Sequence, residues 1–435
     1  MNHIIPKFII YRNLPNDGIL SGMSELFALA EAENPNIDNL TDLALEQINK
    51  LLDISTDYGF NGNLWQNYLT FVLITNENPF SLTSEKIGAK QGSVNIFAKQ
   101  DFELFIKLFH YDFTKLEALL SMNCFSIITD YQAIDKPELM YNKNVSLRVR
   151  KLSQKLAGTN NADEFFDLVT DFYKDYGVGM FGLNKAFRIT EGTDKPIAFQ
   201  AINNMGQVVL DDLIGYEEQK RQLVENTKAF VEGRKANNVL LFGDSGTGKS
   251  TSIKAIVNEF YRDGLRMIEI YKHQFKNLSD IIATVKNRNY KFIIYMDDLS
   301  FEEFEIEYKF LKAVIEGGVE TKPENILIYA TSNRRHLIKE TWNDRNDMEV
   351  NEELHRSDTM EEKMSLVNRF GVTICYLKPG RQEFYDMVEA LAKKAGLNIP
   401  REQLDLEANR WEMRHGGISG RTAQQFVNHL LSIQK

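Results

Sequence analysis

The chain has 435 residues, of which 43% are hydrophobic and 26% are charged, a composition typical of a globular protein with two or three domains. A net charge of −10 argues against a protein that binds nucleic acid mainly through its overall charge, although a local basic groove is compatible with it. Two distant cysteines and seven scattered histidines argue against a disulfide framework and a zinc site. The short apolar patch from Phe8 to Tyr11 is flanked by Pro6 and Pro15, which argues against a signal peptide, and there is no apolar run of about 18 residues to span a membrane, so we expect a cytoplasmic protein.

Residues 1–195 are predicted to form a mainly helical N-terminal domain. Apolar side chains recur at helical spacing in three stretches of it: Leu43 to Leu52, Phe102 to Phe109, and Phe165 to Phe172. The dense aromatic residues favour a helix-packing core, with a ligand pocket as the alternative: Trp65, Tyr68, Phe71 and Phe125. The segment from about 190 to 207 contains Gly, Pro and Asn with little periodicity, which predicts a linker. The N-terminal domain carries no catalytic pattern.

Residues 205–380 are predicted to form an α/β domain, because near-continuous apolar runs alternate with helical patterns. The runs predict a parallel five-stranded sheet with helices on both faces, with strands at 238–243, 266–271, 291–297, 325–331 and 372–377. In such a doubly wound sheet a ligand is expected at the carboxyl ends of the strands. Residues 381–435 have helical patterns throughout, and Ser419 is predicted to cap the last helix.

The strongest motif follows the first of these strands. The pattern Gly-x-x-x-x-Gly-Lys-Ser runs from Gly243 to Ser250 and predicts a phosphate-binding loop between a buried strand and a helix. Lys249 is expected to contact the β- and γ-phosphates of ATP, and Ser250 is expected to bind Mg²⁺. The alternative is a chance match on a surface turn. The candidate cofactor-binding residues of the loop are Gly243, Asp244, Ser245, Gly246, Thr247, Gly248, Lys249, Ser250 and Thr251.

Two carboxylates follow a second apolar run, Phe292 to Met296. Asp297 is expected to hold Mg²⁺ through water, and Asp298 to polarise an attacking water. The alternative is that both acids are solvated residues at a strand end. Asn333 follows the next strand, where its amide would orient the water or sense the γ-phosphate; the alternative is a turn residue.

These motifs together resemble the AAA+ ATPases over the stretch from Asp211 to Phe426. Within this resemblance, the phosphate loop is Walker A, residues 292–298 are Walker B, and Asn333 falls at sensor 1. The resemblance implies a C-terminal helical lid over 381–435 and an ATP-binding homo-oligomer. It also implies roles for three further segments: adenine packing by Leu213, Ile214 and Gly215, an arginine finger at Arg369, and sensor 2 at Arg421.

The chain further resembles a bacterial family of predicted ATPases of unknown physiological function, in which a helical region precedes the ATPase module. The motifs that carry this resemblance are Leu-Ile-Gly-Tyr-Glu-x-Gln-Lys, Asn-Asn-Val-Leu-Leu, Asp-Asp-Leu-Ser-Phe and Ser-Gly-Arg.

One residue departs from the AAA+ pattern. AAA+ hydrolases usually carry Glu as the second Walker B acid, whereas this chain has Asp298, which is one methylene shorter. We therefore predict slow hydrolysis, or help from Glu302 or Glu303. For the arginines, the alternative is a surface salt bridge, and Arg334 and Arg335 compete with Arg369 for the finger role.

The sequence thus predicts a cytosolic AAA+ ATPase that hydrolyses Mg·ATP as an oligomer and acts on an unknown protein or nucleic acid held by its N-terminal region, away from membranes. One alternative is an ATP-gated switch or scaffold with little turnover. Another is a P-loop kinase for a small molecule, which Arg369 and the Ser-Gly-Arg motif disfavour. Residues 339–362 are expected to form a polar surface excursion that faces a partner. Tyr271 and Phe275 are expected to be buried, with a central-pore loop as the alternative.

Overall fold

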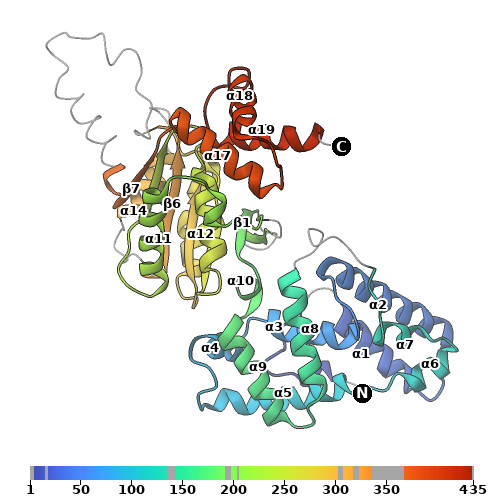
Figure 1. The fold of residues 1–435 in the computed structure, drawn as a ribbon. Helices are drawn as coiled ribbons and strands as arrows, with labels where there is room; N and C mark the ends of the chain where they lie inside the picture. Colours follow the sequence, from blue (N-terminus) through green and yellow to red (C-terminus); the bar gives the residue numbers. More distant parts are fainter. Residues whose placement is uncertain are drawn as a thin grey trace. The chain divides into compact units, whose positions relative to one another are not determined.

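A computed structural model of the chain describes residues 4–14, 18–134, 143–191, 197–202, 205–301, 307–316, 323–334 and 367–433. The chain divides into two compact units, one up to Asn184 and one from Lys185 onward (Figure 1). The predicted helpers Glu302 and Glu303, the competing Arg335 and the predicted excursion at 339–362 lie outside the described residues. Within the described residues, no helix is long and apolar enough to cross a membrane.

The first unit is helical, as the sequence predicts. After a short 3-10 turn, η1 (Ile5–Lys7), its helices are α1 (Ile19–Ala30), α2 (Ile37–Tyr58), α3 (Leu64–Thr75), α4 (Pro79–Ile87), α5 (Ser93–Phe109), α6 (Thr114–Leu120), α7 (Cys124–Thr129), α8 (Lys143–Ala157), α9 (Ala162–Tyr176) and α10 (Gly179–Leu183). The aromatic residues form packed core, since Trp65 is 1% exposed and Tyr68 and Phe125 are 0% exposed. The predicted packing role of these aromatics is therefore confirmed.

Buried polar groups fix the N-terminal segment of this unit. The carboxylate of Asp101 accepts hydrogen bonds from the backbone N–H groups of Ile9, Ile10 and Tyr11 at 2.8–3.2 Å. The hydroxyls of Tyr11 and Tyr173 lie 2.7 Å apart, and Tyr173 donates to the carbonyl of Leu73. These bonds satisfy polar groups that would otherwise be costly to bury, so this part of the unit is structural.

The second unit is built on a mixed sheet. Its strands are β1 (Ala186–Thr190), β2 (Ala198–Ala201), β3 (Val239–Gly243), β4 (Leu265–Glu269), β5 (Lys291–Met296), β6 (Ile326–Ser332) and β7 (Val372–Tyr376). In the described part of the chain the sheet has seven strands in the order β2-β1-β4-β5-β6-β3-β7. The five predicted strands are present as neighbours, and all their pairings are parallel.

The prediction of only five strands is wrong, and so is the predicted linker. β1 pairs parallel with β4, and β2 pairs antiparallel with β1, so the sheet extends into the segment that was expected to be irregular. Both strands are short, and β1, which carries β2, pairs with β4, a strand far away in sequence. Because β1 belongs to the sheet, the second unit begins before the predicted boundary at 195.

Helices cover the sheet and continue beyond it. They are α11 (Glu217–Val231), α12 (Lys249–Phe260), α13 (Leu278–Val285), α14 (Glu307–Glu316), α17 (Arg381–Lys394), α18 (Arg401–Glu412) and α19 (Gly420–Ile433), with 3-10 turns η3 (Leu210–Asp212) and η4 (Lys272–Asn277). Side chains of α11 and α12 pack on one sheet face. Successive strand residues such as Val239 and Leu240 are both 0% exposed, so both faces are buried.

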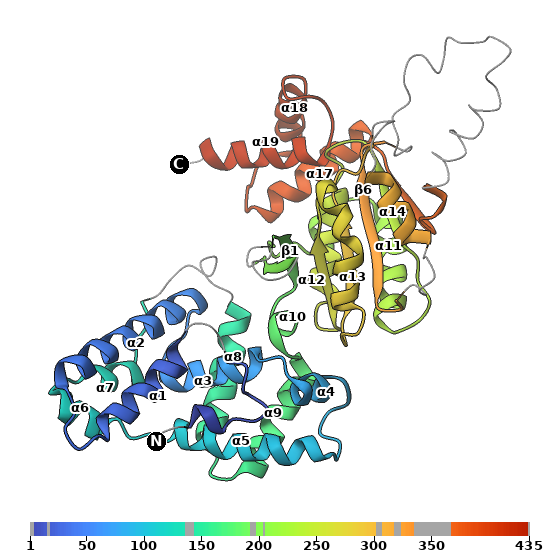
Figure 2. The ribbon, with the colours of Figure 1, turned by 180° about the vertical axis from the view of Figure 1, so that it is seen from behind.

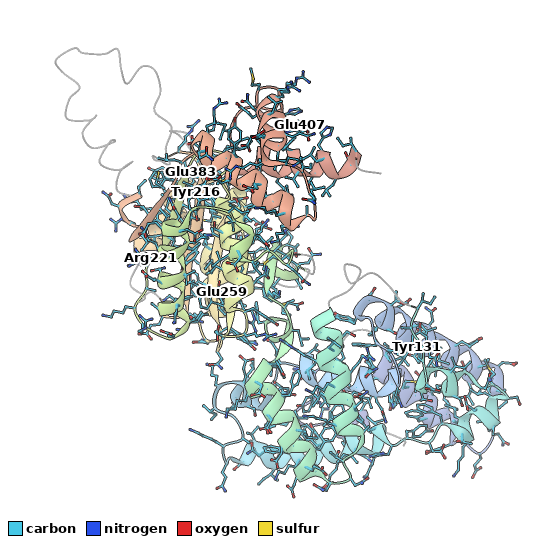
Figure 3. All side chains as sticks on the ribbon, viewed as in Figure 1. Tyr131, Tyr216, Arg221, Glu259, Glu383 and Glu407 are labelled. Atoms are coloured by element: carbon cyan, nitrogen blue, oxygen red, sulfur yellow. The ribbon has the colours of Figure 1, made fainter. Side chains whose placement is uncertain are left out.

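The last three of these helices, α17 to α19, lie together at the C-terminal end of the chain (Figures 1 and 2). Their side chains form an apolar cluster of their own. Ser419 accepts a hydrogen bond from the backbone N–H of Thr422 at 3.1 Å, which confirms it as the predicted cap of α19. Tyr216 packs against both this cluster and the sheet cluster, and it lies close to Glu383 (Figure 3). The C-terminal helices and the sheet therefore share packed side chains.

Two smaller predictions have mixed outcomes. Phe275 is 1% exposed, as expected for a core residue, whereas Tyr271 is 44% exposed, so its predicted burial is wrong. Both cysteines, Cys124 and Cys375, are free.

Candidate functional site

The phosphate loop connects β3 to α12, in the setting that the motif predicts. Gly243 ends β3 with φ +129°, and a Cβ there would lie 2.1 Å from the carbonyl oxygen of Tyr376 on β7. Gly248 precedes α12 with φ +93°, and a Cβ there would lie 2.6 Å from a methyl group of Leu213. Only glycine fits both positions, so the backbone itself explains two of the motif residues.

Lys249, the first residue of α12, is 6% exposed and has its ammonium group surrounded by oxygen atoms. It donates to the carbonyls of Gly243 at 3.0 Å and Asp244 at 2.6 Å, and to Oδ1 of Asn333 at 3.0 Å. Three acceptors match the three hydrogens of an ammonium group. A phosphate oxygen that bound Lys249 would therefore have to replace one of these partners.

Burial lowers the pKa of Lys249. The carboxylates of Asp298, Asp244 and Asp297 offset only part of this effect, so the pKa lies below its usual value. The ammonium group is thus desolvated, and no carboxylate within the described residues forms a direct ion pair with it. A polyanion would supply the missing negative charge.

The two acids after β5 make different contacts. Oδ1 of Asp297 accepts hydrogen bonds from the hydroxyls of Ser250 at 2.7 Å and Thr331 at 2.6 Å. Burial raises the pKa of Asp297, but the bonds from Thr331 and Ser250, together with Tyr295 and the charge of Lys254, lower it by more, so the pKa lies below its usual value. Asp297 and Ser250 together offer the carboxylate and hydroxyl oxygens that suit Mg²⁺.

Asp298 lies in the left-handed backbone region, with φ +50°. Its Oδ1 accepts a hydrogen bond from Nδ2 of Asn333 at 2.7 Å, and its backbone N–H donates to Oγ1 of Thr331 at 2.9 Å. Asp tolerates this conformation better than residues with longer side chains. The departure from Glu in the AAA+ pattern thus coincides with a turn that favours the shorter acid.

These side chains open into a cavity of about 950 Å³, which we call the loop cavity. Its walls come from the segment before α11, the phosphate loop, the ends of β5 and β6, and the helices α17 and α19. The lining includes these predicted site residues: Leu213, Ile214, Ser245, Gly246, Thr247, Gly248, Lys249, Ser250, Thr251, Asp297, Asp298, Asn333 and Arg421.

Four predicted site residues lie outside the lining. Gly215 and Gly243 shape the backbone next to it, and Asp244 accepts a hydrogen bond from the N–H of Lys378 at 2.8 Å, which ties the loop to the chain after β7. Arg369 is exposed, outside the loop cavity of its own chain. Arg334, which competes for the finger role, is also exposed, and its N–H donates to Ser332.

The sequence analysis missed several lining residues. An apolar group gathers where adenine was expected: Val208, Met387, Leu391 and Ala395 join Leu213 and Ile214. Asp212 and Lys394 form an ion pair at the same end of the loop cavity. Only Thr331 had a usable signal, because it precedes Asn333 at the same strand end. The residues of α17 lie on a helical stripe that looks like ordinary core in the sequence.

The C-terminal helices reach the phosphate loop directly. The backbone N–H of Arg421, at the start of α19, donates to the carbonyl of Gly246 at 3.1 Å. Gln424 and Gln425, one turn further along α19, also line the loop cavity. A ligand in this cavity would thus touch both the sheet and the C-terminal helices.

A sequence model of one protein family matches residues 183–434, more than half of the chain. The family is described as "Protein of unknown function (DUF815)". The match covers nearly the same residues as the second structural unit.

Short matches to characterised proteins also exist. The replication factor C large subunit of Aeropyrum pernix is 36% identical over 74 residues, which is 17% of this chain and 15% of that protein. The same subunit of Methanococcus vannielii is 32% identical over 75 residues, again 17% of this chain and 15% of that protein. The matches therefore span only a small part of those relatives. Together with the family match, they support the resemblance to AAA+ ATPases that the motifs carry.

Among solved structures, the Holliday junction branch migration motor RuvB of Thermotoga maritima is similar with a TM-score of 0.36 and 15% identity. The similarity covers 52% of this chain and 65% of that chain. A second solved structure of RuvB from the same organism, a point-substituted form, gives a TM-score of 0.37 at 16% identity, with the same coverage.

Proposed function

The chain belongs to the DUF815 family, and from this premise we propose that it is an ATPase that binds Mg·ATP in the loop cavity and hydrolyses it. One observation carries the proposal: Lys249, Ser250, Asp297 and Asn333, from three separate elements, meet within hydrogen-bond distance at the carboxyl ends of β3, β5 and β6. A buried ammonium group beside a glycine loop at a helix start suits the β- and γ-phosphates.

The proposed metal site consists of Ser250 and Asp297. Mg²⁺ is usually bound in proteins by one or two carboxylates together with substrate phosphates, and the oxygen atoms of these two side chains fit that donor set. When bound, Mg²⁺ would offset the negative charge of the phosphates. Thr331 holds Asp297 by a second hydrogen bond.

The proposed catalytic roles follow from what each side chain can reach. Asp298 would accept the proton of the attacking water, and the amide of Asn333, which contacts both Asp298 and Lys249, would orient that water. At the other end of the cavity, Leu213 and Ile214 would pack on adenine, next to Gly215.

We propose that α17 to α19, over residues 381–435, act as a lid. The contact between Arg421 and Gly246 and the ion pair between Lys394 and Asp212 support this role, because each joins the C-terminal helices to a different part of the loop cavity. Arg421 would contact the γ-phosphate of its own chain.

The proposed active form is a homo-oligomer in which Arg369 acts in the loop cavity of a neighbouring chain. Its exposed position outside its own cavity supports a role in trans. The first unit, which the family match does not cover, would hold the protein or nucleic-acid partner in the cytoplasm.

The experiment that tests this function is complementation between two inactive variants. Lys249→Ala should lose ATP binding but keep Arg369, and Arg369→Ala should bind ATP but lose turnover. Mixing them should restore part of the ATPase activity, because some interfaces then combine an intact loop with an intact arginine. If neither variant changes nucleotide binding or turnover, the proposed function is wrong.

A second candidate is an ATP-gated switch with little turnover. The observation that favours it is the filled set of acceptors around Lys249, together with the short Asp298 in place of Glu. Nucleotide binding would then rearrange Asn333 without fast chemistry. ATP binding in calorimetry, with no phosphate release at any protein concentration, would select the switch.

A further inference from the structure

The hydroxyl group of Thr331 lies between the two acids that follow β5. It donates to Oδ1 of Asp297 at 2.6 Å and accepts from the backbone N–H of Asp298 at 2.9 Å. A hydroxyl has one hydrogen to donate, and here Asp297 takes it, while a lone pair serves Asp298. Thr331 is 1% exposed, so water cannot readily replace either bond.

The main chain of Thr331 adds a third contact to the same segment. Its carbonyl oxygen accepts from the backbone N–H of Leu299 at 2.7 Å. Three successive residues, Asp297 to Leu299, are therefore held by one residue of the neighbouring strand β6. Between them the chain turns, with Asp298 at φ +50°.

This turn determines where the two carboxylates point. Neighbouring side chains in an extended strand point to opposite faces, so two consecutive acids could not both serve one site at a strand end if β5 simply continued. The left-handed residue breaks that alternation: Asp297 contacts Ser250 and Asp298 contacts Asn333. A left-handed non-glycine residue costs free energy and persists only when neighbours hold it.

We propose that Thr331 is a positioning residue that assigns the two acids their separate tasks, Asp297 to the metal and Asp298 to the water. This inference rests on the proposed ATPase function and extends it to a residue whose hydroxyl is bonded to Asp297 and Asp298. The hydroxyl group of Thr331, and not the shape of its side chain, performs the positioning. A valine at this position would keep the shape and lose both hydrogen bonds.

The test compares Thr331→Val with Thr331→Ser. The first readout is the ratio of the ATP dissociation constants measured by calorimetry with EDTA and with Mg²⁺. This ratio, the gain in ATP affinity from Mg²⁺, should shrink about 10- to 100-fold in Thr331→Val, which is the usual cost of losing a group that orients a metal ligand. Thr331→Ser keeps the hydroxyl and should restore the gain, and ATP affinity in EDTA should be similar in all three proteins.

The second readout separates positioning from stability. Thr227 on α11 is also fully buried, and its hydroxyl lies 2.7 Å from that of Tyr329 on the same strand β6. Thr227→Val should lower the melting temperature without changing the gain from Mg²⁺ or kcat. Thr331→Val should raise KM for Mg·ATP in step with the weaker Mg·ATP binding, and it should also lower kcat, because Asp298 loses its position.

The outcomes separate the two proposals. If the wild-type protein binds no Mg·ATP, the proposed function fails, and the inference fails with it. If the wild type shows the gain from Mg²⁺ and folded Thr331→Val shows it equally, only the inference is overturned. An equal effect of Thr331→Val and Thr331→Ser, or the same Mg²⁺ response in Thr227→Val, would also overturn it.

Discussion

Asn333 donates a hydrogen bond of 2.7 Å from Nδ2 to Oδ1 of Asp298, although the two residues are 35 positions apart. The other end of the same amide accepts a hydrogen bond from Lys249. One side chain therefore connects the residue proposed to bind phosphate with the residue proposed to activate water. The connection is possible because β3, β5 and β6 are parallel and end on the same edge of the sheet.

We predict that Asn333→Ala separates binding from turnover. It should lower kcat about 100-fold, because the water loses its orientation. ATP affinity should be unchanged or higher, since Lys249 loses an acceptor that competes with phosphate. Asn325→Ala is the matched control: this amide lies just before the other end of β6 and bonds to the carbonyl of Val285 at 2.9 Å, so it should affect stability only. A parallel loss of affinity and turnover in Asn333→Ala would contradict the prediction.

We predict slow turnover with Asp298 as the second acid. A steady-state kcat below about 1 s⁻¹ is expected, under the typical enzyme value of about 10 s⁻¹, because the carboxylate is short and held by Asn333. Asp298→Asn keeps the shape and the tolerance for the left-handed backbone, so it should still bind ATP while its phosphate release falls. Turnover of about 10 s⁻¹ or more that disappears completely in this variant would show that Asp298 suffices as a fast base.

We predict that Gly243→Ala damages both stability and ATP binding. The new Cβ would meet the Tyr376 carbonyl oxygen at 2.1 Å, and φ is +129°. Gly264→Ala is the control, because φ there is +90° and nothing lies within 4 Å of the new Cβ. Gly243→Ala should lower the free energy of unfolding by about 2 kcal/mol or more beyond the control, since the clash adds to the backbone strain. Equal unfolding midpoints in urea would refute the steric account.

The pKa of Asp297 predicts a pH dependence of stability in protein free of nucleotide and Mg²⁺. In the folded state the pKa of Asp297 lies below the ordinary value of 3.8. At a given pH near these values, the folded protein therefore binds fewer protons at this carboxylate than the unfolded chain does. The stabilisation is therefore present above the unfolded pKa and is lost as the pH falls through the folded pKa. Asp297→Asn should be less stable than wild type at about pH 6, and the difference should shrink toward about pH 3.

Urea unfolding in EDTA across this range measures the difference. Asp42→Asn, at an exposed carboxylate of α2, controls for the change in net charge. A difference between wild type and Asp297→Asn that stays constant with pH would mean that Asp297 gains no stabilisation from Ser250 and Thr331.

The sequence by itself determined the parts of this protein that local chemistry dictates. The phosphate loop could be predicted because Gly243 and Gly248 adopt backbone geometries that only glycine tolerates, and Lys249 must follow them. The five strands β3 to β7 were predicted because each is a near-continuous apolar run, as expected for a parallel sheet covered by helices. The helix cap at Ser419 follows from the same local reasoning.

The tertiary structure decided the features that depend on distant partners. β2 lies in a segment that looks irregular in the sequence; it is a strand because it pairs with β1, which in turn pairs with the distant β4. Lys394 and Asp212 pair across 182 positions of chain, and Thr331 reaches Asp297 and Asp298 only because β5 and β6 are neighbours. Local sequence patterns determine backbone conformation and burial. These contacts depend instead on which strands and helices pack together, and that packing is determined by the free energy of the whole fold.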